Sequence, residues 1–142
     1  YGDKKGTLER FCKNFELLND DTKKRLVIEN DDSPNEYSVK DLFDGVYQTI
    51  GIPITFDYFH HKFNTGGLTE EEALKMAAIT WPEGIAQCCH YSESRRKEKL
   101  DESIRPQAHS DLIYEKIQTY GLEPDIVIEA KLKEQSIFKR VI

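Results

Sequence analysis

Four short apolar segments of the sequence each end in side chains that can bind a metal ion. These side chains are carboxylates and imidazoles at or just beyond the last position of each segment: Glu29, Asp57, His60, His90 and Glu129. Carboxylates and imidazoles without organised thiolates suit Zn²⁺, Mn²⁺ or Fe²⁺ in a hydrolytic site rather than a structural zinc site. A carboxylate that bridges two ions would create the kind of site that cleaves phosphate esters.

The segment 52–61 carries this pattern most clearly. It begins with apolar residues that include Ile54 and Phe56, and it then turns polar at Asp57, His60 and His61. The carboxyl end of a strand is where open α/β sheets and α/β barrels bind their ligands. Taken alone, the segment fits a core strand that ends in a solvated loop equally well, but the other three strand ends favour a metal site.

The strand ends can converge only if the strands pair in parallel. We expect strands over 25–30, 52–57, 85–91 and 125–129, and helices over 7–18, 39–50, 70–79, 112–120 and around 132–138. Polar loops are expected over 19–24 and 92–105, Ser38 and Thr69 are expected helix caps, and Gly51 is an expected helix end. Apolar strands that alternate with helices predict an α/β fold with parallel strands, whose carboxyl ends share one edge.

Composition excludes several classes of protein. The chain has 142 residues and a net charge of −6, which argues against nucleic-acid binding by bulk positive charge. Its apolar runs are far shorter than the roughly 20 residues of a membrane helix, so no membrane is expected as a partner. Three cysteines, at 12, 88 and 89, form a poor disulfide framework and indicate a reducing, intracellular compartment. Cys88 and Cys89 are expected to be small buried strand residues.

The number of strand–helix units is too small for a closed barrel. An eight-stranded barrel takes about 250 residues, whereas this chain predicts about four units. It is therefore either a small open α/β domain or half of a TIM barrel.

Six motifs in chain order resemble the UV-damage endonuclease family, whose members are DNA-repair enzymes on a TIM-barrel scaffold related to endonuclease IV. The motifs are Arg25–Asp32, Gly51–His61, Thr80-Trp81, His90–Ser94, Ala108–Asp111 and Ile128–Gln135. The resemblance implies that residues 1–142 form a single partial domain, the carboxyl-terminal half of a TIM barrel with strands five to eight. The amino-terminal half, with two further histidine ligands, is expected to be absent.

The resemblance also implies a set of metal ligands. Glu29 would bridge two ions, while Asp57, His90 and Glu129 complete the shell of one of them, and these four are the expected catalytic residues. His60 and His109 would serve another ion. His61 has no implied role, and we expect it beside the ligands or in solvent. The family usually has a Lys two residues before the position of His90, where this chain has Cys88, and this departure would weaken the site.

The implied activity is hydrolysis of the phosphodiester 5′ to UV photoproducts, which are cyclobutane pyrimidine dimers and 6-4 products, by a metal-activated water. The implied cofactor is a divalent metal ion, Mn²⁺ first, with Zn²⁺, Mg²⁺ and Co²⁺ as alternatives. The implied partner is damaged double-stranded DNA, bound by a monomer of the full-length protein. The location would be the nucleus of a eukaryote, or otherwise the cytoplasm or the site of viral replication.

Basic side chains in the predicted rim loops are candidates for phosphate contacts: Arg95, Arg96, Lys131 and Lys133. For Arg95 and Arg96, a solvated charged loop is an equally good interpretation. Two other functions stay open. One is a metal-dependent barrel of the sugar-isomerase or AP-endonuclease type, and the other is an inactive fragment or remnant without activity alone.

Overall fold

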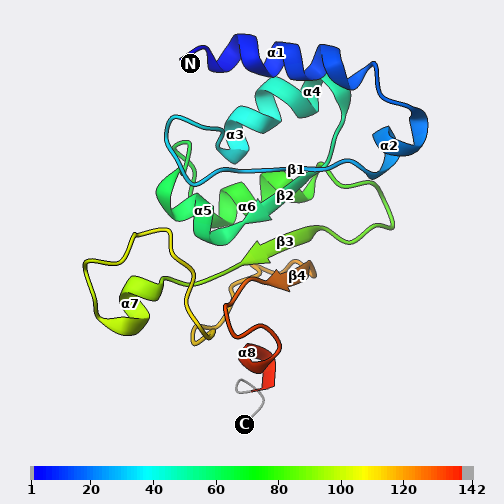
Figure 1. Ribbon diagram of the computed structural model, residues 1–142. Helices are drawn as coiled ribbons and strands as arrows, with labels where there is room; N and C mark the ends of the chain where they lie inside the picture. Colours follow the sequence, from blue (N-terminus) through cyan, green and yellow to red (C-terminus); the bar gives the residue numbers. More distant parts are fainter. Residues whose placement is uncertain (1, 139–142) are drawn as a thin grey trace.

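The structure is a computed structural model that describes residues 2–138. Within these residues the chain forms an open, four-stranded parallel sheet in the order β1-β2-β3-β4 (Figure 1). The strands are β1 (Ile28–Glu29), β2 (Ile54–Asp57), β3 (Cys88–Tyr91) and β4 (Asp125–Ile128). The predicted α/β class and parallel pairing are confirmed, and the arrangement is consistent with part of a TIM barrel.

The strand register brings two of the predicted site residues level with each other, since Asp57 pairs with His90 across β2 and β3. Glu29 pairs with Thr55, two residues before Asp57. All pairs are parallel, so the carboxyl ends of the strands lie at one edge of the sheet.

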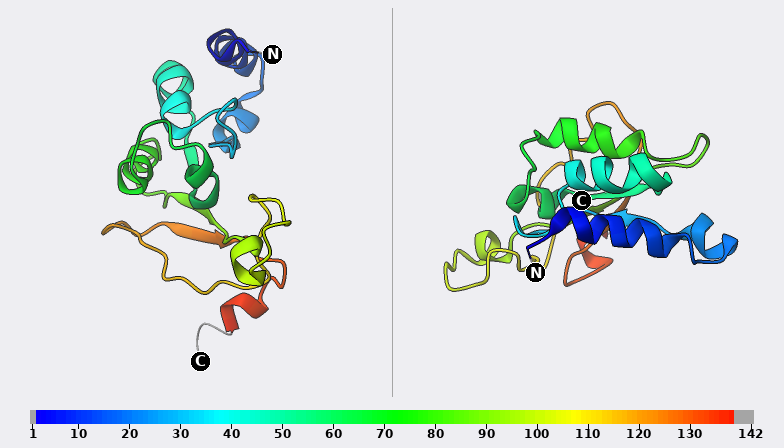
Figure 2. Two further views of the ribbon diagram at one scale, coloured as in Figure 1. Left: turned by 90° about the vertical axis from the view of Figure 1, so that its left-hand side faces the viewer. Right: turned by 90° about the horizontal axis from the view of Figure 1, so that it is seen from above.

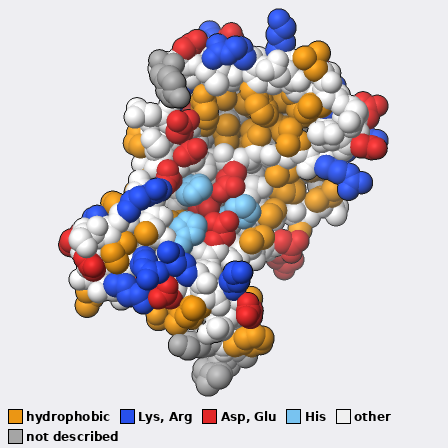
Figure 3. Space-filling view, viewed as in Figure 1, with side chains coloured by type: hydrophobic (Ala, Val, Ile, Leu, Met, Phe, Trp, Pro, Cys, Tyr) orange, Lys and Arg blue, Asp and Glu red, His pale blue; other side chains and the backbone are white. Residues whose placement is uncertain are grey.

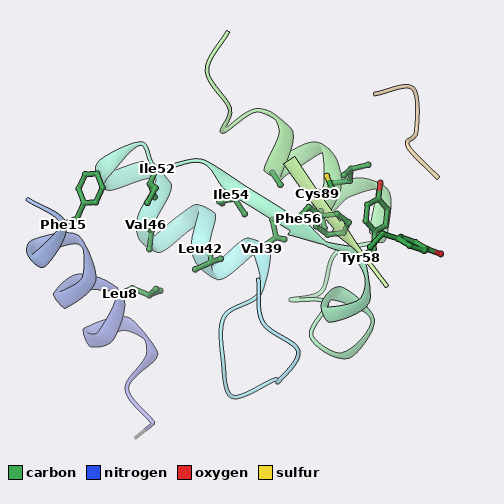
Figure 4. Packing of buried hydrophobic residues seen from close by; sticks show 14 of the residues in the cluster. Leu8, Phe15, Val39, Leu42, Val46, Ile52, Ile54, Phe56, Tyr58 and Cys89 are labelled. Atoms are coloured by element: carbon green, nitrogen blue, oxygen red, sulfur yellow. The ribbon is translucent and has the colours of Figure 1, made fainter. Parts of the chain in front are cut away.

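Helices cover one face of this sheet: α3 (Val39–Leu42), the π-helical turn η1 (Phe43–Tyr47), α4 (Gln48–Ile50) and α6 (Glu70–Ala78). Helix α1 (Lys4–Phe15) forms an outer layer that packs on η1. The α3–α4 unit packs between α1 and the sheet, and side chains such as Val39 and Val46 meet Ile54 and Phe56 in the core (Figure 4). Figure 2 shows that α1 and α8 (Gln135–Phe138) lie at opposite ends of the molecule.

The predicted helix caps are confirmed. Ser38 and Asp41 form a capping box, and so do Thr69 and Glu72. Gly51 ends α4 with a φ of 70°, a left-handed conformation that glycine adopts without a steric cost. The helix end at Gly51 lies just before β2 and therefore helps to determine where Asp57 lies.

The predicted polar loop at 19–24 is wrong, because residues Asp20–Arg25 form helix α2. Asn19 caps it by accepting a hydrogen bond from the backbone of Thr22, and acidic residues at its start and basic residues at its end match the helix dipole. β1 is correspondingly shorter than the predicted strand 25–30. Likewise the predicted loop 92–105 contains a short helix, α7 (Arg95–Lys99).

The predicted helix at 112–120 is also wrong, since these residues form bends and irregular backbone. Backbone N–H groups of this segment donate to carboxylates from elsewhere in the chain. Tyr114 and Glu115 donate to Glu93 at 2.8–3.1 Å, and Leu112 donates to Glu98 at 3.2 Å. These long-range bonds hold the segment in place, and local periodicity does not reveal them.

Several apolar side chains remain solvent-exposed on the sheet. Val27 is 40 % and Val127 is 48 % exposed, and β4 alternates between exposed and half-buried positions. Among the described residues, no helix has both the length and the apolar character to cross a bilayer.

Removing the Glu93 carboxylate should destabilise the fold. Glu93→Ala leaves two partly buried backbone N–H groups without their charged acceptor, so we expect the free energy of unfolding to fall by about 2–3 kcal/mol in urea titrations. The control is Glu102→Ala, whose side chain is 88 % exposed and forms an ion pair with Arg96; it should change stability by less than about 0.5 kcal/mol. Equal effects of the two substitutions would contradict the role of Glu93.

Candidate metal centre

The predicted ligands gather at the carboxyl edge of the sheet. Acidic and histidine side chains form a cluster on the face shown in Figure 3, below a broad apolar area. The elements that carry them are the ends of the four strands, the short helix α5 (Tyr58–Phe63) that directly follows β2, and the loop before β4. The side chains are Glu29, Asp57, His60, His90, His109 and Glu129.

Asp57 is the buried centre of this cluster. Its side chain has no exposed surface. Its Oδ1 caps α5 by accepting hydrogen bonds from the backbone N–H groups of Phe59 and His60, at 2.7 and 2.8 Å. Its Oδ2 is buried and has no hydrogen-bond partner among the described residues. An unsatisfied buried carboxylate oxygen costs free energy, and a cation at this position would satisfy it.

Burial also changes the protonation of this carboxyl group. It raises the pKa of Asp57 to about 6, an effect that the negative charge of Glu29 increases and that the N–H and the ring of His60 oppose. A bound cation would favour the ionised form and reverse this shift.

Two groups of side chains have the spacing of a metal shell. Glu29, Asp57 and His60 form one, and Asp57, His90 and Glu129 form the other, with the ligand atoms in each within 4.8 Å of one another. Asp57 belongs to both groups. The donor set of carboxylates and imidazoles therefore fits a divalent ion, and the shared member fits a pair of ions.

Glu29 lies between two of the histidines. Its Oε2 is 3.2 Å from His90 Nδ1 and its Oε1 is 3.5 Å from His60 Nδ1. The closer neighbour of His60 Nδ1 is the backbone carbonyl of Asn30, at 2.8 Å. This carbonyl accepts a hydrogen bond from Nδ1–H, which leaves the lone pair on Nε2, 3.8 Å from Asp57 Oδ2.

His109 lies at the border of the site and belongs to neither group. Its Nδ1 is 3.9 Å from Glu129 Oε2, and its ring packs edge-on against Phe59 with centroids 5.8 Å apart. An isolated bridge to Ser94 holds its backbone. Reasoning from strand ends did not find His109, because it lies in a loop; only the family resemblance indicated it.

His61 lies outside the cluster. It is 3 % exposed and packs against Phe56, with ring centroids 5.4 Å apart, so the expectation of a solvent position is wrong. Burial lowers the pKa of His61, although Glu70 and the backbone of Leu68 oppose the shift.

The two adjacent cysteines differ in their surroundings. Cys89 is fully buried in the core, whereas Cys88 is half-buried. Burial raises the pKa of the Cys88 thiol, and the charges of Asp125 and Glu29 raise it further. Cys88 therefore lies near the ligand cluster as a neutral thiol, and it belongs to neither ligand group.

The basic candidates fall into two pairs. Arg95 forms an ion pair with Asp111 at 2.7 Å, and Arg96 binds the backbone of Ile104 and the carboxylate of Glu102. Lys131 and Lys133 are exposed just after β4. The guanidinium groups are thus engaged within the protein, while both lysines are open to solvent, and Lys131 lines a surface pocket with His109 and Glu129.

Replacing Asp57 with Asn should stabilise the metal-free protein, in a pH-dependent way. Between the ordinary pKa of 3.8 and about 6, the folded carboxyl keeps a proton that the unfolded chain releases, so wild-type stability falls as pH rises through this window. The neutral amide of the variant carries no such penalty. We expect the stability difference in favour of Asp57→Asn to grow by about 2–3 kcal/mol across the window. Urea titrations in EDTA at several pH values measure it, and a difference independent of pH would contradict it.

Comparisons with known proteins place the chain in a family. The family model described as UV-endonuclease UvdE matches residues 1–141. The UV-damage endonuclease of Schizosaccharomyces pombe is 39 % identical over 142 aligned residues, which cover 96 % of this chain and 23 % of that protein. The UV DNA damage endonuclease of Clostridium perfringens is 34 % identical, and the match covers 98 % of this chain and 34 % of that protein.

A solved structure is similar as well. The crystal structure of SacUVDE matches with a TM-score of 0.80 and 34 % identity, over 97 % of this chain and 45 % of the other. The chain spans less than half the length of each of these relatives. With a family model that matches nearly all of its residues, the chain belongs to the UV-endonuclease UvdE family.

Proposed function

We propose that this chain supplies the carboxyl-terminal half of a metal-dependent endonuclease that hydrolyses the phosphodiester 5′ to UV photoproducts in double-stranded DNA. The family supports the reaction class, and the share of SacUVDE that the chain matches supports the assignment to half of a barrel. In this proposal the full-length protein is a monomer, located in the nucleus if its source is eukaryotic and otherwise in the cytoplasm or at the site of viral replication.

The observation that carries the proposal is the orphaned Oδ2 of Asp57. Asp57 belongs to both ligand groups, so its buried carboxylate can serve either group or both. A surface cluster with no ligand would have exposed, solvated carboxylates, and its acidic groups would repel one another without compensation. The geometry therefore supports a pair of divalent ions held by Glu29, Asp57, His60, His90 and Glu129. The proposal adds His109 on the family resemblance.

When bound, such ions lower the pKa of a water and stabilise the charge of a leaving oxygen. The residues of this chain prepare that chemistry. Asn30 and Asp57 orient the ring of His60, and burial removes competing water from Oδ2. Glu129 is placed by the hydrogen bond from its own N–H to the carbonyl of Tyr91, at 2.9 Å. We propose Mn²⁺ as the ion, since its oxygen and imidazole preferences match the donor set.

DNA would contact the rim of the site. Lys131 and Lys133 follow Glu129 closely, so phosphates that they bind would pass beside the metal centre. Arg95 and Arg96 could join this contact by exchanging their internal carboxylates for phosphate oxygens.

Nicking of UV-irradiated supercoiled plasmid tests the proposed activity. The assay uses the chain alone and a chimaera in which the chain replaces the matched region of the Schizosaccharomyces pombe enzyme. We expect the chimaera to nick irradiated plasmid in Mn²⁺ and to leave unirradiated plasmid intact. Asp57→Ala in the same chimaera should reduce the rate by about 10²-fold or more, because both ligand groups lose their shared carboxylate residue.

The outcomes separate the alternatives. If the chimaera nicks irradiated plasmid and the chain by itself does not, the chain works as half of the enzyme. Absence of nicking, together with a chimaera that folds and binds no Mn²⁺, would mean that the chain is an inactive remnant, and Cys88→Lys is then the variant to examine. UV-dependent nicking that survives Asp57→Ala would contradict the assigned site.

The rim lysines can be tested through the salt dependence of DNA binding. Each phosphate contact contributes about 0.9 to the slope of log affinity against log salt. The double substitution Lys131→Ala and Lys133→Ala should therefore lower the slope by about 1–2 in fluorescence-anisotropy titrations with an irradiated duplex. The control is Lys75→Ala, an exposed lysine on α6 paired with Glu71. An equal effect of the control would show that only net charge matters.

A further inference from the structure

We propose that Asn30 is a positioning residue of the metal centre, and that its side-chain amide joins the ends of β1 and β2 so that Asp57 and His60 are held in their ligand positions. The inference rests on the proposed metal-dependent function, and it assigns a role to a residue outside the ligand set.

The amide makes a paired contact with the backbone of Asp57. Asn30 Oδ1 accepts a hydrogen bond from the N–H of Asp57 at 2.8 Å, and Asn30 Nδ2 donates to the carbonyl of Asp57 at 3.0 Å. Regular pairing between β1 and β2 ends at Glu29 and Thr55. The side chain thus satisfies both backbone groups of Asp57 that continued pairing with β1 would otherwise bond.

The same residue orients His60 through its main chain. Its carbonyl is 2.8 Å from His60 Nδ1. Because the side chain ties Asn30 to Asp57, the carbonyl is held at a fixed place relative to the helix that begins after Asp57. This contact selects the ring tautomer with the proton on Nδ1, and it directs Nε2 toward Asp57 Oδ2. Hydrogen bonds of this kind raise ligand basicity and fix ring orientation in metal sites.

The side chain of Asn30 fits this positioning role because its amide carries both a hydrogen-bond donor and an acceptor. Asn30 is 1 % exposed, and a buried amide is costly unless both its donor and its acceptor are satisfied. An aliphatic residue of similar volume would fill the same space but would leave both backbone groups of Asp57 unbonded. Asn30 also follows Glu29 directly, so one short segment controls three members of the ligand cluster.

A purely structural role is the alternative, and a matched control separates the two. Thr80 Oγ1 accepts a hydrogen bond from the N–H of Ile54 at 2.8 Å, and Thr80 is 4 % exposed. This is a buried side-chain bond to the backbone of the same strand, β2, at the end away from the metal centre. Thr80→Val removes it and keeps the volume of the side chain.

The experiment compares Asn30→Ala, Asn30→Ser and Thr80→Val in the full chain. Mn²⁺ affinity is measured by calorimetry, stability by urea titration, and the His60 tautomer by ¹⁵N NMR of the metal-free protein at a pH where the ring is neutral. We expect all three variants to lower the urea midpoint. Only the Asn30 variants should weaken Mn²⁺ binding, by roughly 10- to 100-fold for Asn30→Ala and by less for Asn30→Ser, whose hydroxyl is a smaller polar group that can replace at most one of the two bonds.

The His60 tautomer is measured in the metal-free protein, so this result does not depend on metal binding. In the metal-free wild type, His60 should carry its proton on Nδ1, and Asn30→Ala should increase the Nε2-protonated form, whereas Thr80→Val should not. If Asn30→Ala does not fold, Asn30→Ser provides the test. Unchanged tautomer populations and unchanged affinity in a folded Asn30 variant would overturn the proposal. Wild type that shows the Nδ1 tautomer but binds no Mn²⁺ would overturn the proposed function and leave the positioning contact in place.

Discussion

The dehydration of a single carboxylate is the constraint on which the site depends. Asp57 ends a strand whose residues are all buried, and it begins a helix whose first N–H groups occupy one of its oxygens. The other oxygen is removed from water without a partner among the described residues. The flanking core of Ile54, Phe56 and Tyr58 imposes this burial. The packing that stabilises the sheet therefore also leaves a buried carboxylate oxygen that a bound cation would satisfy.

The surrounding ligands are less buried and depend on this anchor. Glu29, His90 and Glu129 retain between about a quarter and a third of their side-chain exposure, and they come from three strands whose register with β2 is set by backbone bonds. Hydrogen bonds to the carboxylates of Glu93 and Glu98 hold the loop that follows His109. The site is therefore assembled by backbone register and long-range carboxylates rather than by one motif.

Parallel pairing and several helix boundaries could be predicted from the sequence, because each has a local signal. Apolar runs mark the strands, and Ser38, Gly51 and Thr69 mark helix boundaries. The convergence of the strand-end ligands followed from the rule that parallel strands end at a common edge. Residues 112–120 could not be predicted, since the carboxylates that hold them lie far away in sequence. Asn30 was missed because nothing about an asparagine at a strand end shows that its amide bonds the next strand.

The helix cap at Asp57 has a consequence for coordination. Oδ1 is committed to the N–H groups of Phe59 and His60, so Asp57 would hold a cation through Oδ2 alone. A chelating, two-oxygen mode would require the first turn of α5 to open and would displace His60, which that turn carries. The number of Asp57 oxygens that can bind a cation therefore depends on whether the first turn of α5 stays intact. An ion large enough to require both oxygens would break the hydrogen bonds of that turn.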